Sequence, residues 1–401
     1  MRVLISPIGS RGDVQPMLAL ALELRSLGHS AILCVPPDFK TWVESFDVTC
    51  TPIGPDFQAW VSAEAQKANP WLPYLKFMRD TMQTQFQVLA KAAPGCDLIV
   101  GGGLQCAGYS IAEALKIPYV YAASCPAAIP LSDHSPPSIR SQSLPRWANQ
   151  MLWTTGGLVW NRVSRRTINE QRATLGLKPV GNILRHVFTA RPWLAADAVL
   201  APAASSGDIQ VTQTGAWFLS DPNPLPNRVE QFLADGEPPI YFGFGSMPAR
   251  LPAQTSSVFV EAARALGRRA VISNGWAGLD VIDTRADCIS IGAVNHEKLF
   301  QRVAAIVHHG GAGTTTAVAR AGKPQIVAPH ILDQYYWAHR VRKLGVGVSG
   351  LNPANLSVDR LIRALRECLR PEVAARAQEL AGRIELRGTR IAAERLIKEF
   401  G

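Results

Sequence analysis

The sequence contains no long apolar run and no patterned set of cysteines. It has no uninterrupted stretch of about 18 apolar residues, so we expect no membrane-spanning helix. The seven cysteines include no C-x-x-C pair and have no metal-ligand spacing, which predicts reduced, buried thiols in a cytoplasmic protein. The first apolar run ends by Ile8 and is followed by Arg11 and Asp13, so a secretory leader is not expected either.

Charged residues are sparse, at 18% of 401 residues, and hydrophobic residues make up 47%. This length favours two domains of about 200 residues each, and nothing in the composition indicates disorder. The net charge of +10 favours an anionic partner, which could be a nucleic acid, an acidic lipid surface or a phosphorylated small molecule. The basic residues are scattered and no nucleic-acid-binding signature accompanies them, so we expect no nucleic-acid partner. Peripheral membrane association stays open, as does the choice between monomer and homodimer.

Short apolar strand-like runs alternate with helix-like segments along both halves of the chain. Such alternation predicts parallel sheets covered by helices on both faces. Residues 219–239 contain five prolines and interrupt the pattern, which restarts with IYFGFGS. We therefore predict two Rossmann-like, doubly wound α/β domains, an N-terminal domain at 1–218 and a C-terminal domain at 240–401, joined by a linker at 219–239. The final helix remains free to pack back on the N-terminal domain.

The segment GSRGDVQP, residues 9–16, joins the first strand-like run to a helix expected from about Gln15. Asp13 stands at the start of this helix, where a carboxylate can serve simply as a cap. It also stands at the carboxyl end of a predicted strand, where parallel sheets bind their ligands, so it is equally a candidate general base. An ordinary Asp is a weak base at neutral pH. Burial would strengthen Asp13 as a base, whereas the nearby Arg11 would weaken it.

The segment VHHGGAGTTTAVARAG carries His308 and His309 from a predicted strand into a glycine loop that opens a helix. Free N–H groups at such a helix start bind phosphate, which indicates a diphosphate site that needs no metal. An alternative is that one histidine belongs to the core and the other to the surface. A dinucleotide site is a third candidate, since Asp333 follows Gly313 by 20 residues, but Thr316 replaces the third glycine of that fingerprint.

Two long motifs give the chain a resemblance to a known family. The first is GSRGDVQP, and the second is the block 292–347, which includes GAVNHEKLF, HHGGAGTT and DQYYWAHRV. Together they resemble the GT-B glycosyltransferases that use nucleotide-diphosphate sugars, and most of all the bacterial branch that glycosylates glycopeptide antibiotics and sterols. The resemblance implies two domains facing across a cleft. It also implies an inverting hexosyltransferase that uses a UDP- or dTDP-sugar as co-substrate, with no cofactor and no metal.

The resemblance also implies roles for individual residues. Asp13 is at the catalytic-base position, and Ser10, Arg11 and Gly12 share its loop. Residues 294–297, including Val294 and His296, would contact the nucleoside, near an aromatic position that Trp276 resembles. The remaining implied donor contacts, to the diphosphate and the sugar hydroxyls, are Ser246, His309, Gly311, Gly313, Thr314, Asp333 and Gln334.

The acceptor is less defined than the donor. Aromatic residues gather in 56–90, and residues 126–190 include the run MLWTTGGLVW, which favours a lipophilic acceptor with a hydroxyl, such as a sterol, hopanoid, polyketide or aromatic aglycone. A sugar-nucleotide epimerase, a protein that only binds sugar nucleotides and, less favoured, an NAD-dependent dehydrogenase remain the alternatives.

Overall fold

The computed structural model divides the chain into two compact units. It describes residues 1–56, 58–59, 71–204, 208–245, 254–275, 279–280, 283 and 285–401, and only the backbone at 71–77. One unit comprises Met1–Pro136, Leu144–Leu219 and Glu385–Gly401, and the other comprises Pro137–Ser143 and Ser220–Ile384. From Ser220 on, the proline-rich segment expected to be a linker thus belongs to the second unit, and part of it forms a helix, α8 (Asn227–Ala234).

The first unit is built on a seven-stranded sheet in the order β3-β2-β1-β4-β5-β6-β7. Every pair of neighbouring strands is parallel. Its central strands carry continuous apolar runs, as strands buried on both faces must. The strands are β1 (Arg2–Ile8), β2 (Ser30–Val35), β3 (Thr49–Pro52), β4 (Leu98–Gly103), β5 (Tyr119–Ala123), β6 (Trp193–Leu194) and β7 (Thr212–Gln213).

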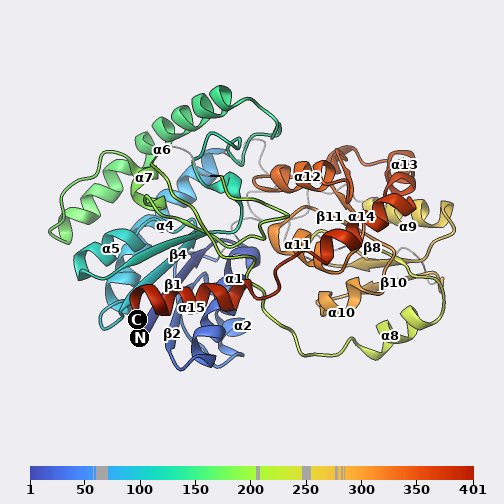
Figure 1. Cartoon of the computed structure of the whole chain (residues 1–401), viewed down its shortest axis with the longest axis horizontal. Helices are drawn as coiled ribbons and strands as arrows, with labels where there is room; N and C mark the ends of the chain where they lie inside the picture. Colours follow the sequence, from blue (N-terminus) through green and yellow to red (C-terminus); the bar gives the residue numbers. More distant parts are fainter. Residues whose placement is uncertain are drawn as a thin grey trace. The chain divides into compact units, whose positions relative to one another are not determined.

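The helices of the first unit include the C-terminal helix of the chain, α15 (Gly388–Phe400). It packs on α1 (Arg11–Ser26), and Arg390 pairs with Glu23 at 3.1 Å. Figure 1 shows α15, in red, beside the blue N-terminal elements. The other helices are α2 (Lys40–Glu44), α4 (Trp71–Ala92), α5 (Gly108–Leu115), α6 (Arg146–Thr174), α7 (Ile183–Phe188) and the short 3-10 turns η1 (Pro37–Phe39) and η2 (Pro126–Ala128).

The second unit repeats the plan with a six-stranded parallel sheet in the order β10-β9-β8-β11-β12-β13. Neighbouring residues of β8 point to opposite faces, so Phe242 packs into one buried cluster and Tyr241 into the other. Leu225 and Val229, from the proline-rich segment, belong to the cluster around Tyr241. The strands are β8 (Ile240–Gly243), β9 (Ala270–Ser273), β10 (Cys288–Ile291), β11 (Ala305–His308), β12 (Gln325–Val327) and β13 (Gly347–Ser349).

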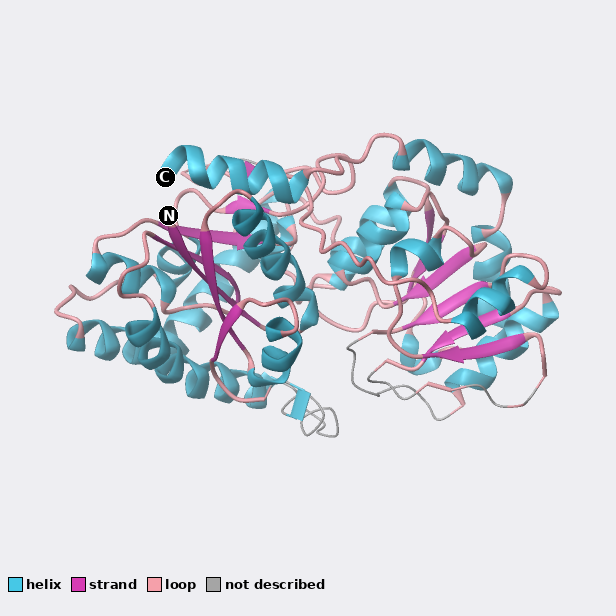
Figure 2. Ribbon diagram, turned by 90° about the horizontal axis from the view of Figure 1, so that it is seen from below, coloured by secondary structure: helices cyan, strands magenta, loops and turns pink. Residues whose placement is uncertain are grey.

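Helices cover both faces of this second sheet, as Figure 2 shows. Besides α8, they are α9 (Thr255–Ala265), α10 (His296–Phe300), α11 (Ala312–Arg320), α12 (Gln334–Lys343), η3 (Pro353–Asn355), α13 (Val358–Cys368) and α14 (Pro371–Ala381). The prediction of two Rossmann-like, doubly wound α/β units is therefore confirmed.

Each sheet has one point where the strand order reverses direction. In the first unit it lies between β1 and β4, and in the second between β8 and β11. Loops that leave such a pair of strands at their carboxyl ends diverge and leave room for a ligand. The loop with Asp13 follows β1, and the glycine loop with His309 follows β11, so both candidate sites lie at these positions.

Candidate functional site

Asp13 lies in the first turn of α1, and the helix begins at Arg11, earlier than the sequence indicated. The cause is Ser10, which caps the helix: its hydroxyl accepts a hydrogen bond from the Gly12 N–H at 3.2 Å. In return, Oδ2 of Asp13 accepts the Ser10 backbone N–H at 2.8 Å and the Ser10 hydroxyl at 3.2 Å. This capping box holds the carboxylate in one orientation.

Two glycines make room for the carboxylate. A Cβ on Gly9 would lie 2.2 Å from Oδ2 of Asp13, and a Cβ on Gly103 would lie 3.2 Å from Oδ1 and 2.2 Å from the Ile8 carbonyl oxygen. Gly103 also has a φ of +61°, which disfavours any side chain. Within the described part of the chain, Oδ1 has no hydrogen-bond partner, so this oxygen is available to a ligand.

Burial raises the pKa of Asp13 from 3.8 to about 6, although the two hydrogen bonds from Ser10 act in the opposite direction. Arg11 is exposed, and its guanidinium lies over the ring of Trp42, 4.6 Å from the ring centroid. Of the two influences on Asp13 that the sequence left open, burial is therefore the stronger. A carboxylate with a pKa near 6 is a much better proton acceptor than an ordinary Asp.

In the second unit, no side chain of the N-cap residue caps the start of α11. Its cap, Gly311, has no side chain to bond the first N–H groups, and a Cβ on Gly313 would meet nothing within 4 Å. The hydroxyls of Thr315 and Thr316 bond carbonyls of their own helix, at 2.9 and 2.8 Å, and Thr314 is half-buried. Among the described residues, the first N–H groups of α11 have no partner, and together with the helix dipole they suit an anion such as a phosphate.

The two adjacent histidines differ in environment. His308 is fully buried, accepts the Gly310 N–H on Nδ1 at 3.1 Å and contacts Gln325 Oε1 through Nε2 at 2.9 Å, so it belongs to the core. His309 is half-buried, with its ring against the glycine loop: a Cβ on Gly311 would lie 2.6 Å from its Nε2. Burial lowers the pKa of His309 to about 3, so the ring is neutral in the ligand-free protein and can donate one N–H.

The segment 294–297 follows β10 and leads into α10. Val294 packs against the cluster around Tyr241, and the ring of His296 stacks on Phe300 at a centroid distance of 4.6 Å. The hydroxyl of Tyr241 lies 3.4 Å from Nε2 of His296. These contacts engage His296 in packing within its own unit, and its expected contact with the nucleoside stays a prediction.

Asp333 and Gln334 lie at the start of α12, after β12, and both hold their own loop together. Oε1 of Gln334 accepts the backbone N–H groups of His330 and Ile331 at 2.7 and 3.1 Å. Oδ2 of Asp333 accepts the indole N–H of Trp337 at 3.1 Å. The loop thus has a defined shape in the ligand-free protein.

The predicted donor residues of the second unit follow the carboxyl ends of adjacent strands. Gly245, after β8, approaches His309, since its Cβ would lie 3.2 Å from Cε1 of that ring. Gly275, after β9, approaches Gly245 still more closely, because its Cβ would lie 2.5 Å from the Gly245 carbonyl oxygen. Ser246 and Trp276, the next residues in these two loops, lie outside the described residues.

Two residues near these sites were not singled out from the sequence. Gly103 ends the predicted strand CDLIVGGG, and its glycine run was the available signal. His330 precedes Gln334 in the loop after β12, and its ring contacts Phe244 edge to face, with centroids 5.2 Å apart. Burial lowers the pKa of His330 to about 4, and the ring in turn helps to keep the pKa of His309 low. No local pattern marked it.

One group of potential metal ligands, Asp283, Asp287 and Cys288, occurs among the described residues. Arg264 bonds both carboxylates, at 2.7 Å to each, so their charges are already compensated. The group lies outside the predicted donor residues.

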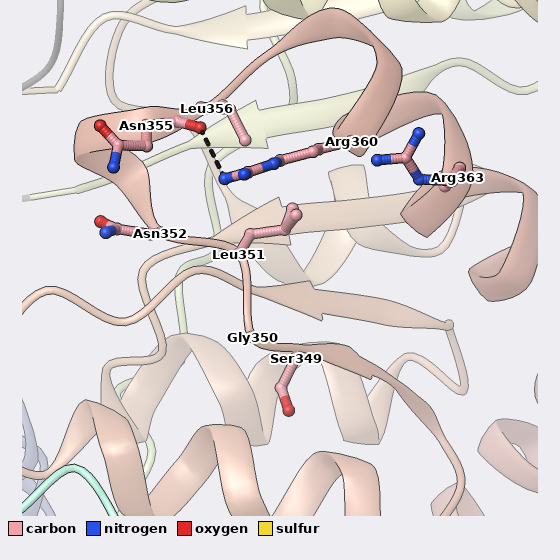
Figure 3. Close-up of a pocket in the computed structure, with 8 residues that line it drawn as sticks. All are labelled: Ser349, Gly350, Leu351, Asn352, Asn355, Leu356, Arg360 and Arg363. Atoms are coloured by element: carbon pink, nitrogen blue, oxygen red, sulfur yellow. Dashed lines mark hydrogen bonds between the residues drawn. The ribbon is translucent and has the colours of Figure 1, made fainter.

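A pocket of about 260 Å³ lies after β13, at the start of α13. Figure 3 shows that Arg360 and Arg363 extend from α13 on one side of it, and Arg360 bonds the Asn355 carbonyl oxygen at 3.4 Å. No predicted donor residue lines this pocket. Its lining residues are Ser349, Gly350, Leu351, Asn352, Asn355, Leu356, Arg360 and Arg363.

Comparisons with known proteins identify the family and the fold. Residues 3–128 match the glycosyltransferase family 28 N-terminal domain, and residues 281–385 match the erythromycin biosynthesis protein CIII-like C-terminal domain. Two proteins of Amycolatopsis orientalis are 42% identical to this chain: glycosyltransferase GtfE, over 100% of this chain and 98% of its own length, and vancomycin aglycone glucosyltransferase, over 99% and 97%. The structure of glycosyltransferase VinC in complex with dTDP is similar in fold, with a TM-score of 0.72 at 21% identity over 99% of both chains.

Proposed function

The chain belongs to the natural-product glycosyltransferases of the GT-B fold, and from this premise we propose that it is an inverting hexosyltransferase with Asp13 as its general base. It is a glycosyltransferase that acts on nucleotide sugars, as the family resemblance implied. The proposal adds the mechanism, a UDP- or dTDP-hexose as donor, and a hydroxyl of a lipophilic small molecule as acceptor.

The observation that carries the proposal is the state of the Asp13 carboxylate. Oδ2 is fixed by Ser10, Oδ1 is available, and the pKa is near 6. In the reaction, Asp13 takes the proton of the acceptor hydroxyl while the oxygen attacks the anomeric carbon. The bond from that carbon to the diphosphate breaks, and the nucleoside diphosphate leaves with the bonding electron pair. One attack from the opposite side inverts the anomeric carbon and needs a single base.

The loop before α11 would hold the diphosphate. Its open N–H groups and the neutral N–H of His309 provide donors for the charge that develops on the leaving group. We propose that these groups stabilise the diphosphate without a metal and that the enzyme uses no cofactor. Asp333 would contact the sugar, while Gln334 keeps the loop in shape.

The acceptor class is the least constrained part of the proposal. Vancomycin aglycone glucosyltransferase acts, by its name, on vancomycin aglycone, so this compound belongs beside sterol, hopanoid, polyketide and aromatic aglycones among the candidates. The seven cysteines are free, which supports a site of action in the cytoplasm. We leave open whether the enzyme works as a monomer or a homodimer.

The test is a product assay with purified protein. UDP- and dTDP-hexoses are offered with a panel of these acceptors, and mass spectrometry detects the addition of one hexose. NMR of the product then gives the anomeric configuration, which should be opposite to that of the donor. Retention of configuration would contradict the single-base mechanism, and no transfer to any lipophilic acceptor would contradict the proposed acceptor class.

A further inference from the structure

Several large apolar side chains that the structure leaves exposed lie on one helix, α6. Trp147, Met151 and Leu158 are 69%, 62% and 66% exposed. Successive residues of an α-helix are about 100° apart around its axis, so these three fall within a sector of about 40°. They form an apolar stripe along the N-terminal half of the helix. Figure 1 shows α6 at the edge of the first unit. We call these three residues the α6 stripe.

Further along α6, the same face carries positively charged side chains. Arg162 and Arg165 are exposed, and Arg165 follows Trp147 by 18 residues, or about five helical turns, so the two point in the same direction. Within the described part of the chain, neither arginine has an acidic partner. The next one, Arg166, pairs with Glu170 at 2.8 Å. Residues 146–169 contain four arginines and no acidic residue.

Buried contacts attach α6 to the rest of the first unit. Ile168 and Arg172 are buried, and the Arg172 guanidinium bonds Glu113 at 2.8 Å. Trp153 donates its indole N–H to the His134 carbonyl oxygen at 3.0 Å. The exposed stripe is therefore presented by an anchored helix with a defined orientation.

We propose that this face of α6 binds the surface of an anionic lipid bilayer. A helix with Trp and Leu on one side and arginines beside them has the composition of interfacial membrane-binding helices. The stripe would enter the boundary between head groups and acyl chains, with Arg162 and Arg165 at the lipid phosphates. No helix in the described ranges is long and apolar enough to span a bilayer, so the attachment is peripheral. The inference goes beyond the proposed transferase activity and does not depend on it.

A second copy of the chain fits this face less well. A twofold interface pairs a surface patch with itself, and Arg162 and Arg165 would then find no complementary acidic groups on the partner patch. Anionic head groups supply this complement, and the net charge of +10 attracts the whole protein to them.

The experiment measures co-sedimentation of the full chain with vesicles of phosphatidylcholine alone or mixed with phosphatidylglycerol. We expect binding only to the mixed vesicles, weakened by added salt because the charge attraction is screened. The double variant Arg162→Gln/Arg165→Gln should lower the partition coefficient about 30-fold, since each basic residue near such a surface contributes a factor of about five. Met151→Gln/Leu158→Gln should lower it at least about tenfold, and glutamine preserves the helix.

The matched control is Arg363→Gln/Arg366→Gln, which removes two exposed arginines of the same spacing from α13. It should bind vesicles like the unchanged protein. Equal loss in the control would show a general charge effect and overturn the proposal. The proposal also fails if the unchanged protein stays in the supernatant with mixed vesicles. Analytical ultracentrifugation tests for a dimer. If the unchanged protein is a dimer that Met151→Gln/Leu158→Gln dissociates, and neither protein binds vesicles, the face is assigned to a second copy. A raised acceptor KM without vesicle binding would assign it to the acceptor.

Discussion

The backbone N–H of Ser10 lies 2.8 Å from Oδ2 of Asp13 and donates a hydrogen bond to it. This bond bears on both proposed roles of Asp13, as helix cap and as general base. As a cap, the carboxylate needs only one of its oxygens. Oδ1 is left available, and burial has raised the pKa of the group to about 6. Capping the helix and accepting a proton are therefore compatible in this geometry, and experiments can separate them.

Asp13→Asn should reduce kcat by about 10²–10⁴-fold, because the amide keeps the shape and accepts the Ser10 N–H but cannot take a proton. Single-turnover kinetics would ensure that the chemical step, and not product release, is measured. The melting temperature should hardly change, since Asn caps about as well as Asp. A variant that retains half of the kcat of the unchanged enzyme would exclude Asp13 as the base.

The pH dependence should follow the raised pKa of Asp13. In the free enzyme, kcat/KM should fall as the pH drops below about 6, instead of near 4 as for an ordinary Asp. The folded state binds this proton more tightly than the unfolded chain, so the contribution of Asp13 to stability is fully present below about pH 4 and is lost as the pH rises through about 6. Comparing thermal unfolding of the unchanged protein and Asp13→Asn across this range would check the sign. An acid limb of the kcat/KM profile near pH 4 would contradict the argument that burial raises the pKa of Asp13.

Gly103→Ala should destabilise the protein and impair catalysis together. Its Cβ would lie 2.2 Å from the Ile8 carbonyl oxygen and press towards Asp13. The control is Gly28→Ala, because Gly28 also has a positive φ, +82°, but has nothing within 4 Å of a new Cβ. The control should cost about 1 kcal/mol in urea unfolding, and Gly103→Ala clearly more. Equal losses of stability in the two variants would show that the close approach at Gly103 can relax.

Asp333→Ala should weaken binding of the sugar nucleotide and leave binding of free UDP or dTDP nearly intact, because its proposed contact is to the sugar. Asp333 also accepts the Trp337 indole N–H, so Asp333→Asn serves as a control that keeps this acceptor. Calorimetry with the free nucleotide and with the sugar nucleotide distinguishes a contact with the sugar from a role in loop structure. Equal losses for both ligands in Asp333→Ala would assign the residue to loop structure.

Removal of divalent metal should leave turnover almost unchanged. In the proposed mechanism, the N–H groups at the start of α11 and the His309 ring provide the donors that a diphosphate requires. The measurement is kcat after treatment with EDTA. A loss of more than about tenfold that Mg²⁺ or Mn²⁺ restores would mean that these donors do not suffice.

The sequence by itself determined the alternation of strands and helices, and with it two parallel sheets and the loops that we propose hold the ligands. These features depend on local periodicity and on glycines at the ends of strands, which neighbouring residues specify. For the two adjacent histidines, the alternation of side chains along a strand left open that one belongs to the core and the other to the surface. The structure places His308 in the core, where it contacts Gln325 from the next strand.

Only the tertiary structure decided the state of Asp13. Its pKa depends on desolvation, which no local pattern reports. One of the groups close to the carboxylate, Gly103, is 90 residues away in the sequence. The same holds for the return of α15 to the first unit and for the apolar stripe on α6. A helical repeat shows which residues share a face, but which face is covered depends on what the rest of the chain packs against it.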